Sequence, residues 1–112
     1  MNMIGHNRAR GGRMYAITFD LDTQILEQSY GNASWRNVYA DIRNALRNHG
    51  FGWQQGSVYF GDETVNAVSC VLAVQDLTRR FPWFRPSVRD MRMLRIEENN
   101  DLGPAIEQAA NG

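Results

Sequence analysis

The chain has 112 residues and a mass of 12.8 kDa, so we expect one domain and exclude a multi-domain enzyme. All twelve basic residues are arginine, which excludes mechanisms that need a lysine, such as a Walker loop or a Schiff base. The single cysteine, Cys70, excludes a disulfide framework and a four-cysteine zinc site. No apolar run approaches the ~20 residues of a membrane span or resembles a signal peptide, so we expect a cytoplasmic protein without membrane contact.

The first thirteen residues differ in composition from the rest of the chain. Residues 1–13 are polar and lack periodicity, so we predict a flexible basic tail before a single domain over residues 14–112. The tail holds three arginines, which leaves nine arginines against twelve acidic residues in the domain. This balance does not favour nucleic-acid binding by bulk charge, so any such contact must depend on the local placement of arginines.

The domain opens on a clean alternation of apolar and polar residues. Residues 15–22 predict a half-buried strand that ends in two carboxylates, Asp20 and Asp22. An amphipathic helix is expected next, beginning at residues 32–34 and ending before Gly50, a residue typical of helix C-termini.

Two short aromatic segments, residues 50–55 and 57–60, then predict a pair of strands. Residues 65–80 predict a second helix that is apolar nearly all round its middle, so we expect it to be well buried. The proline-containing aromatic segment 81–86 cannot continue this helix and is expected to be a connection.

A fourth strand is expected over residues 88–97, although a helix with an arginine stripe is an alternative there. Met91 and Met93 suit one face of this strand and the apolar residues after them suit the other, so we expect a bulge. Pro104 indicates a short C-terminal helix.

The order strand, helix, strand, strand, helix, strand is the βαββαβ arrangement of ferredoxin-like α+β domains. In this fold both helices cover one face of an antiparallel sheet, and the other face stays open unless a partner covers it. The side chains expected to face the helices are Ile17, Phe19, Val58 and Phe60. Those expected on the open face are Asp20, Asp22, Ser57 and Tyr59.

Residues 19–23 match the first motif of haloacid-dehalogenase-type phosphatases, an apolar strand followed by D-x-D-x-T. In those enzymes the first Asp attacks phosphorus and the second acts as the acid and base. They also need a downstream lysine and a longer parallel sheet. Because the chain has no lysine and is too short for that sheet, we reject this interpretation.

Read as a whole, residues 14–107 resemble the VapD (virulence-associated protein D) family of small toxin-like bacterial endoribonucleases. The segments that carry the resemblance are MYAITFDLD at 14–22, GF…QGSVYF within 50–60, PWF at 82–84 and SVRDMRMLRIEENNDL at 87–102. The resemblance implies a ferredoxin-like homodimer related to the small nucleases of CRISPR spacer acquisition. It also implies RNA cleavage and, in some members, a small antitoxin partner.

Phosphodiester cleavage needs a group that deprotonates or orients the attacking oxygen, and cations that stabilise charge on the phosphate. Asp20 is our candidate for the base, or for a ligand of a Mg²⁺ ion shared with the dimer mate. Arg92 or Arg95 would hold the phosphate with paired hydrogen bonds. Tyr59 and Trp53 would stack on unpaired bases.

Two further candidates for the catalytic group come from the third strand. Ser57 belongs to the QGS segment of the resemblance, and the lack of a suitable histidine pair leaves the base role to a carboxylate or to a tyrosine such as Tyr59. We expect the first and third strands to run parallel, however, which would separate Ser57 from Asp20 within one subunit.

Each candidate also has a structural alternative. Asp20 can cap a turn or helix, Asp22 is expected to be a turn residue, and Asp90 can form a structural ion pair with Arg92. His49 at a helix C-terminus and Cys70 within a helix are expected to be structural.

The hypothesis from the sequence is a homodimeric endoribonuclease that cleaves single-stranded RNA around Asp20, with arginines of the fourth strand on the phosphate. The rival hypothesis is a non-catalytic dimeric module whose open sheet face binds RNA or an antitoxin. The negative charge of the domain favours the rival.

Overall fold

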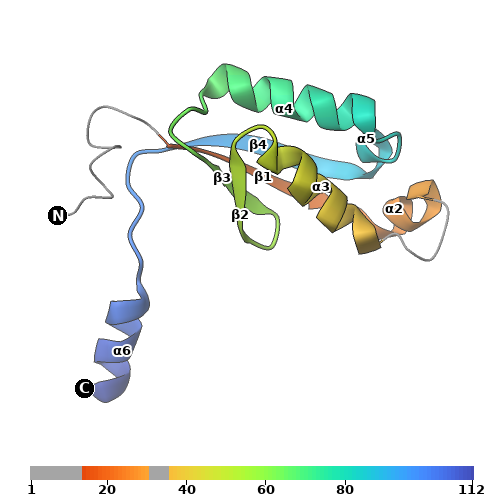
Figure 1. Ribbon diagram of the computed structural model, residues 1–112. Helices are drawn as coiled ribbons and strands as arrows, with labels where there is room; N and C mark the ends of the chain where they lie inside the picture. The colour runs from red at the N-terminus through yellow and green to blue at the C-terminus, as the bar shows by residue number, and fades with distance from the viewer. Residues whose placement is uncertain (1–13, 31–35) are drawn as a thin grey trace.

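The computed structural model describes residues 14–30 and 36–112, and its four-stranded antiparallel sheet has the order β2-β3-β1-β4 (Figure 1). The elements along the chain are β1 (Met14–Leu21), α2 (Thr23–Tyr30), α3 (Val38–Arg47), β2 (Phe51–Gln55), β3 (Val58–Gly61), α4 (Ala67–Arg80), α5 (Phe84–Ser87), β4 (Val88–Ile96) and α6 (Gly103–Asn111). The predicted ferredoxin-like α+β class is confirmed. The expected tail 1–13 and the helix start at 32–34 lie outside the described residues.

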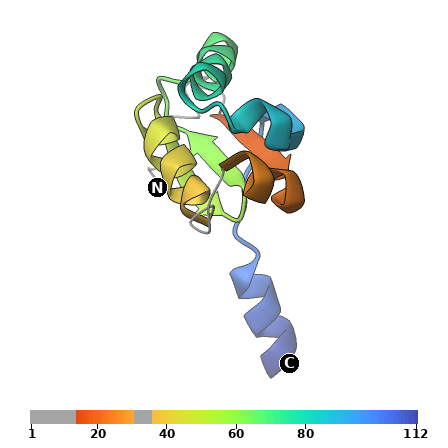
Figure 2. The ribbon, with the colours of Figure 1, turned by 90° about the vertical axis from the view of Figure 1, so that its right-hand side faces the viewer.

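The helices α3 and α4 lie on one face of the sheet, and no described helix covers the other, which we call the open face (Figures 1 and 2). The core therefore forms between this helix layer and the sheet. Its largest fully buried apolar and aromatic side chains are Ile17, Leu26, Val38, Ile42, Leu46, Tyr59 and Leu77. Those from α3 recur every three to four residues, so they form the single apolar stripe that a two-layer fold requires.

The helix α2 is an element that the sequence did not predict. Asp22 begins it, because its Oδ1 accepts hydrogen bonds from the backbone N–H groups of Gln24 and Ile25, both at 3.0 Å. Leu26 is its only buried residue, so the helix has no apolar stripe for a sequence pattern to reveal. The structural interpretation of Asp22 is confirmed, and its expected place on the open face is wrong because it lies beyond the end of β1.

The expectation that the second helix would be buried nearly all round is wrong. In α4, Cys70, Ala73 and Leu77 face the core, whereas more than half of the surface of three apolar side chains is exposed. These three are Val68 at 64%, Val71 at 53% and Leu72 at 51%. The reason is that a helix in the outer layer meets the sheet along one stripe only.

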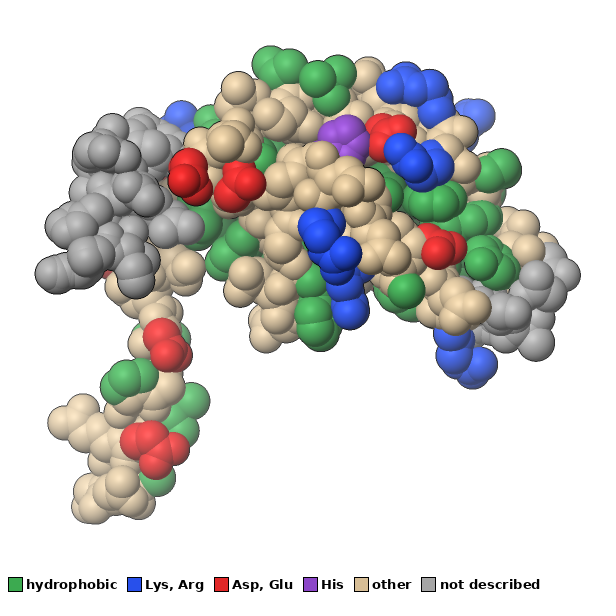
Figure 3. All heavy atoms as spheres, viewed as in Figure 1, with side chains coloured by type: hydrophobic (Ala, Val, Ile, Leu, Met, Phe, Trp, Pro, Cys, Tyr) green, Lys and Arg blue, Asp and Glu red, His purple; other side chains and the backbone are tan. Residues whose placement is uncertain are grey.

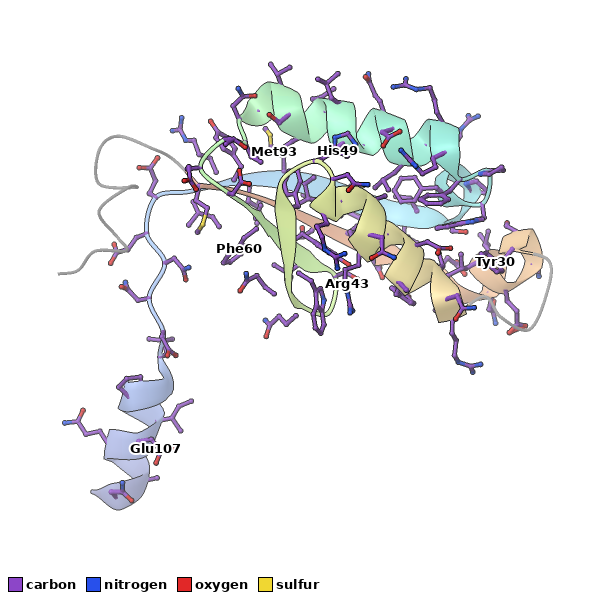
Figure 4. The ribbon with its side chains drawn as sticks, in the orientation of Figure 1. Tyr30, Arg43, His49, Phe60, Met93 and Glu107 are labelled. Carbon is purple, nitrogen blue, oxygen red and sulfur yellow. The ribbon has the colours of Figure 1, made fainter. Side chains whose placement is uncertain are left out.

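The predicted faces of β3 are reversed. Tyr59 pairs with Ile17 of β1, and cross-strand partners share a face, so Tyr59 points into the core with only 1% of its surface exposed. Val58 and Phe60 consequently lie on the open face, and Figure 4 shows Phe60 on the side away from the helices. Val58, Tyr59 and Phe60 are all apolar or aromatic, so the sequence does not show which of them face the core. The pairing register with β1 determines the face of each residue.

The strands β1 and β3 run antiparallel, not parallel as expected. The connection through α2 and α3 leads from β1 to β2, which runs in the same direction as β1. The β2–β3 hairpin then reverses the chain, so β3 runs opposite to β1. The start of β3 therefore lies beside the end of β1, where the N–H of Phe19 donates to the carbonyl oxygen of Ser57 at 3.2 Å. Ser57 is thus close to the strand end that carries Asp20.

The fourth strand, β4, is confirmed, but it has no bulge in its middle. The partners of Met91 and Met93 are Phe19 and Ile17, so the two methionines face the helices. Leu94, opposite Ala16, faces the open side. Both faces of this edge strand hold apolar residues, so the methionines and the later apolar residues need no bulge between them. The register with β1 shifts only at the start of β4, between Val88 and Asp90.

The remaining segments are an aromatic connection and a projecting helix. The connection contains the short helix α5, and Phe81 stacks on Trp83 with ring centroids 4.7 Å apart. The predicted C-terminal helix is present as α6, and none of its residues is buried. Over the described part of the chain, no helix has the length and apolar character needed to cross a membrane.

Candidate active site at the end of β1

Asp20 lies at the end of β1 on the open face, where the alternation of this strand places it. Two-thirds of its side chain is exposed, so the carboxylate is accessible to a ligand. The helix cap that was an alternative role for Asp20 is occupied by Asp22. Asp20 therefore does not cap this helix.

The cross-strand partner of Asp20 is Asp90 on β4. Directly opposite residues of an antiparallel pair have Cβ atoms about 4.5–5.5 Å apart, so the two carboxylates project side by side from the sheet. The sequence showed both residues but not the register that joins them. A pair of like charges in this arrangement attracts cations.

Two arginines of β4 accompany these carboxylates. The Nε of Arg89 lies 3.8 Å from Oδ2 of Asp20, and the Nε of Arg92 donates to both carboxylate oxygens of Asp90, at 3.0 and 3.2 Å. The expected Asp90–Arg92 pair is thus present. About half or more of each of the four side chains is exposed, so these pairs contribute little to folding and their charges stay accessible to a ligand.

Arg95, the other predicted phosphate ligand, does not belong to this group. It stands opposite Tyr15, near the other end of β1 and on the helix side of the sheet, and its Nε contacts Glu97 at 3.3 Å. Arg92 and Arg95 are three positions apart, and side chains an odd number of positions apart on a strand point to opposite faces. Arg89 takes its place beside Asp20, which sequence spacing alone did not single out.

Tyr59 is in the core and not on an RNA-binding surface. Its ring stacks against Phe19 with centroids 5.8 Å apart. Burial raises the pKa of its hydroxyl, and hydrogen bonding and positive charge from Arg43 offset part of that increase. A buried phenol with a raised pKa is a poor base, so the structure does not place Tyr59 among groups that reach substrate.

Trp53 is accessible but lies on the other side of the sheet from Asp20, because it pairs with Tyr59. Its Nε1 donates to the carbonyl oxygen of Gly56 at 2.8 Å, and the guanidinium of Arg43 lies 4.0 Å from the ring centroid. Figure 4 shows Arg43 reaching from α3 toward this hairpin. The arginine therefore occupies one face of the indole, and Trp53 does not join the Asp20 group.

His49 and Cys70 lie outside the Asp20 group. His49 contacts Oδ2 of Asp76 through Nε2 at 2.8 Å and so links the end of α3 to α4 (Figure 4). Burial of Cys70 raises the pKa of its thiol. Across residues 14–30 and 36–112, no cluster of three or more histidine, cysteine or carboxylate side chains forms a potential metal site.

Comparison with known proteins shows the family to which the chain belongs. Residues 13–102 match the family described as CRISPR associated protein Cas2, so the chain is a Cas2-related protein. It is 61% identical over 94 residues to the Endoribonuclease VapD homolog of Helicobacter pylori, covering 84% of this chain and 97% of the relative. It is 53% identical over 93 residues to Endoribonuclease VapD 2 of Riemerella anatipestifer, covering 83% and 99%.

A more distant relative, Endoribonuclease VapD of Dichelobacter nodosus, is 35% identical over 96 residues, covering 86% of this chain and all of the relative. The chain belongs to the VapD endoribonuclease family. The resemblance drawn from the sequence is confirmed, and the hypothesis of a non-catalytic module loses its support.

Proposed function

We propose that this endoribonuclease cuts single-stranded RNA as a homodimer, with Asp20 at the reacting phosphodiester. The observation that carries the proposal is the exposed Asp20 carboxylate on the open face, with Arg89 at 3.8 Å and Asp90 directly across the strand pair. Asp20 orients or deprotonates the attacking oxygen, a role that typically accelerates a reaction by about 10²–10⁴-fold.

The arginines of β4 supply the positive charge that the reaction needs. As the phosphate approaches its transition state, negative charge builds on its oxygens, and guanidinium groups stabilise it with paired hydrogen bonds. Arg92 is held in position by Asp90, and Arg89 is beside Asp20. Ser57 is near this group through its backbone, because its carbonyl oxygen accepts a hydrogen bond from the N–H of Phe19, the residue before Asp20.

The Asp20–Asp90 pair also suits Mg²⁺, which proteins commonly hold through one or two carboxylates together with substrate phosphates. Bound there, the ion would neutralise the phosphate and orient its oxygens. We expect EDTA to abolish cleavage and added Mg²⁺ to restore it. Full activity in EDTA, with metal-free protein confirmed by elemental analysis, would remove the ion from the proposal.

A homodimer follows from the character of the open face. Val58 and Phe60 lie on it, and Leu94, also there, is 47% exposed although it is apolar. An apolar sheet face without a helix over it favours burial against a partner. A second copy placed there by a two-fold axis would bring a second Asp20 to the same cleft.

A toxin-like role and a small antitoxin partner complete the proposal. Expression of the wild-type chain alone should slow bacterial growth, and expression of Asp20→Asn at the same level should not. An antitoxin would restore growth by covering the Asp20 side of the open face. Equal growth inhibition by both proteins would separate toxicity from RNA cleavage.

The test of the function is cleavage of a defined single-stranded RNA oligonucleotide by gel-filtered protein. The activity should follow the protein peak and disappear in Asp20→Asn. Asp22→Asn is the matched control, because asparagine caps a helix about as well as aspartate does. Cleavage that survives in Asp20→Asn, or that separates from the protein peak, would contradict the proposal.

A further inference from the structure

Trp53 is an exposed aromatic side chain with a fixed orientation. It lies in β2 close to the turn of the β2–β3 hairpin, on the helix side of the sheet, and 45% of its surface is exposed. Its Nε1 donates to the carbonyl oxygen of Gly56 at 2.8 Å, and the guanidinium of Arg43 lies 4.0 Å from the ring centroid. Because Arg43 covers one face of the indole, the other face is the part of the ring that a ligand can reach.

A second arginine lies beside the one that holds this ring. Arg43 and Arg47 are four positions apart in α3, so they are neighbours on one side of the helix. Nη1 of Arg47 donates to Oδ1 of Asn44 at 3.2 Å, so the side chain folds back along α3 toward Arg43. Figure 3 shows basic side chains between α3 and the β2–β3 hairpin, next to an exposed hydrophobic group. Trp53, Arg43 and Arg47 therefore form one surface, which we call the Trp53 surface.

The Trp53 surface is positive although the domain is not. The domain has nine arginines against twelve acidic residues, whereas residues 36–60 hold three arginines and a single carboxylate, Asp41. Asp41 accepts a hydrogen bond from the hydroxyl of Tyr30 at 3.5 Å, so it points toward α2 and not toward the hairpin (Figure 4). The hairpin itself, residues 50–60, has no charged side chain and exposes all of residues 52–56. The local charge therefore favours an anionic ligand.

The turn of the hairpin connects the Trp53 surface to the candidate active site. The carbonyl oxygen of Gly56 accepts the hydrogen bond from the indole. The carbonyl oxygen of Ser57, the next residue, accepts one from the N–H of Phe19, which precedes Asp20. Trp53 and Asp20 are on opposite sides of the sheet, but both lie next to this turn. An RNA strand that leaves Asp20 and passes around the turn therefore reaches the indole.

We propose that the Trp53 surface is a second contact site for the RNA substrate, where an unpaired base stacks on the free face of the indole and a neighbouring phosphate pairs with Arg47. The inference rests on the proposed function and adds the course of the strand beyond the cleaved bond. Aromatic rings bind unpaired bases with little regard to sequence, because every base has a flat face. Bases in a duplex already stack on each other, so the site selects single-stranded RNA. Arg43 is a positioning residue that holds the indole.

Fluorescence anisotropy of a labelled single-stranded RNA tests the site, with Asp20→Asn as the parent protein so that the RNA stays whole. Trp53→Ala should weaken RNA binding at least about fivefold, and Trp53→Phe, which keeps an aromatic ring, should retain most of the affinity. Arg47→Gln should also weaken binding, and the matched control Arg79→Gln, at an exposed position of α4, should not. No RNA binding by the parent, unchanged affinity in Trp53→Ala, or equal losses in the two arginine variants would overturn the proposal.

Tryptophan fluorescence separates stacking from a structural role of Trp53. An RNA base that stacks on the indole should quench part of the emission of the Asp20→Asn parent, and Trp53→Phe should remove this quenching while the protein still binds RNA. Quenching that persists unchanged in Trp53→Phe would contradict the stacking. The proposed function fails on a different result, which is cleavage of the RNA by the Asp20→Asn parent on a gel, so the two proposals can fail separately.

Discussion

Asp20 and Asp90 are cross-strand partners at the end of β1, and each carboxylate has its own arginine. Arg89 contacts Asp20, and Arg92 contacts Asp90. The four side chains form a group in which two negative and two positive charges remain exposed to solvent. In the function proposed above, the two arginines contact the phosphate while Asp90 keeps its hold on Arg92 and Asp20 acts on the attacking oxygen.

The first prediction concerns Asp90. It accepts two hydrogen bonds from Arg92, so it holds the guanidinium in place. Asp90→Asn removes the charge and should lower the cleavage rate about tenfold, which corresponds to ~1.4 kcal/mol of transition-state stabilisation. This rate is measured by single-turnover cleavage of an RNA oligonucleotide. An unchanged rate would show that Arg92 does not need its hydrogen bonds to Asp90.

The second prediction compares two arginines on opposite faces of β4. Arg92→Gln should reduce both RNA affinity and cleavage, because it removes a charge-assisted contact with the phosphate. Arg95→Gln is the matched control and should change neither, because Arg95 lies on the helix side. The dependence of RNA affinity on salt should also become weaker in Arg92→Gln only. Equal losses in the two variants would place the RNA elsewhere.

The third prediction concerns Tyr59, which the sequence suggested as a functional residue and the structure buries. Tyr59→Phe keeps the packing against Phe19, so cleavage should persist at close to the wild-type rate. Tyr59→Ala should lower the free energy of unfolding by about 3–5 kcal/mol, as is usual for loss of a buried aromatic side chain. Urea denaturation checks the second value, and a large loss of cleavage in a stable Tyr59→Phe protein would return the residue to the mechanism.

The fourth prediction concerns the pH dependence of stability. Hydrogen bonds hold the pKa of Asp76 below its ordinary value of 3.8; the bond from His49 has the larger effect and the bond from Arg80 the smaller one. The unfolded chain therefore binds this proton more tightly than the folded chain does. The stabilisation is fully present above about pH 4 and is lost as the pH falls through the lowered pKa.

Asp76→Asn should thus be less stable than the wild type near neutral pH, and the difference should shrink in acid. Urea denaturation at a series of pH values measures it. Asp41→Asn, on the neighbouring helix α3, serves as the comparison. A difference that is constant down to strongly acidic pH would show that the contact with His49 does not depend on the charge of Asp76.

Much of the fold could be predicted from the sequence because its main elements carry strong local patterns. The alternation in β1 and the apolar stripe of α3 each reflect a single buried face. The helix α2 escaped prediction because it buries one residue and depends on the Asp22 cap. The face of Tyr59 could not be predicted either, since register is set by pairing between distant strands.

The same limit applies to the candidate site. Asp20 stood out because a carboxylate at the end of an apolar strand is visible in the sequence. Its relation to Asp90, Arg89 and Ser57 depends on the β1–β4 register and on the antiparallel course of β3. Arg95 and Arg92 look equivalent in the sequence. They differ because side chains three positions apart on a strand point to opposite faces of the sheet.

The most direct test of the central claim is the single-turnover rate at which Asp20→Asn cleaves RNA, relative to Asp22→Asn. Both substitutions remove one negative charge from the same end of β1, and only Asp20 projects from the open face. We predict a rate at least about 100-fold lower in Asp20→Asn, with equal thermal stability of the two proteins. Equal rates in the two variants would contradict the assignment of Asp20 as the base.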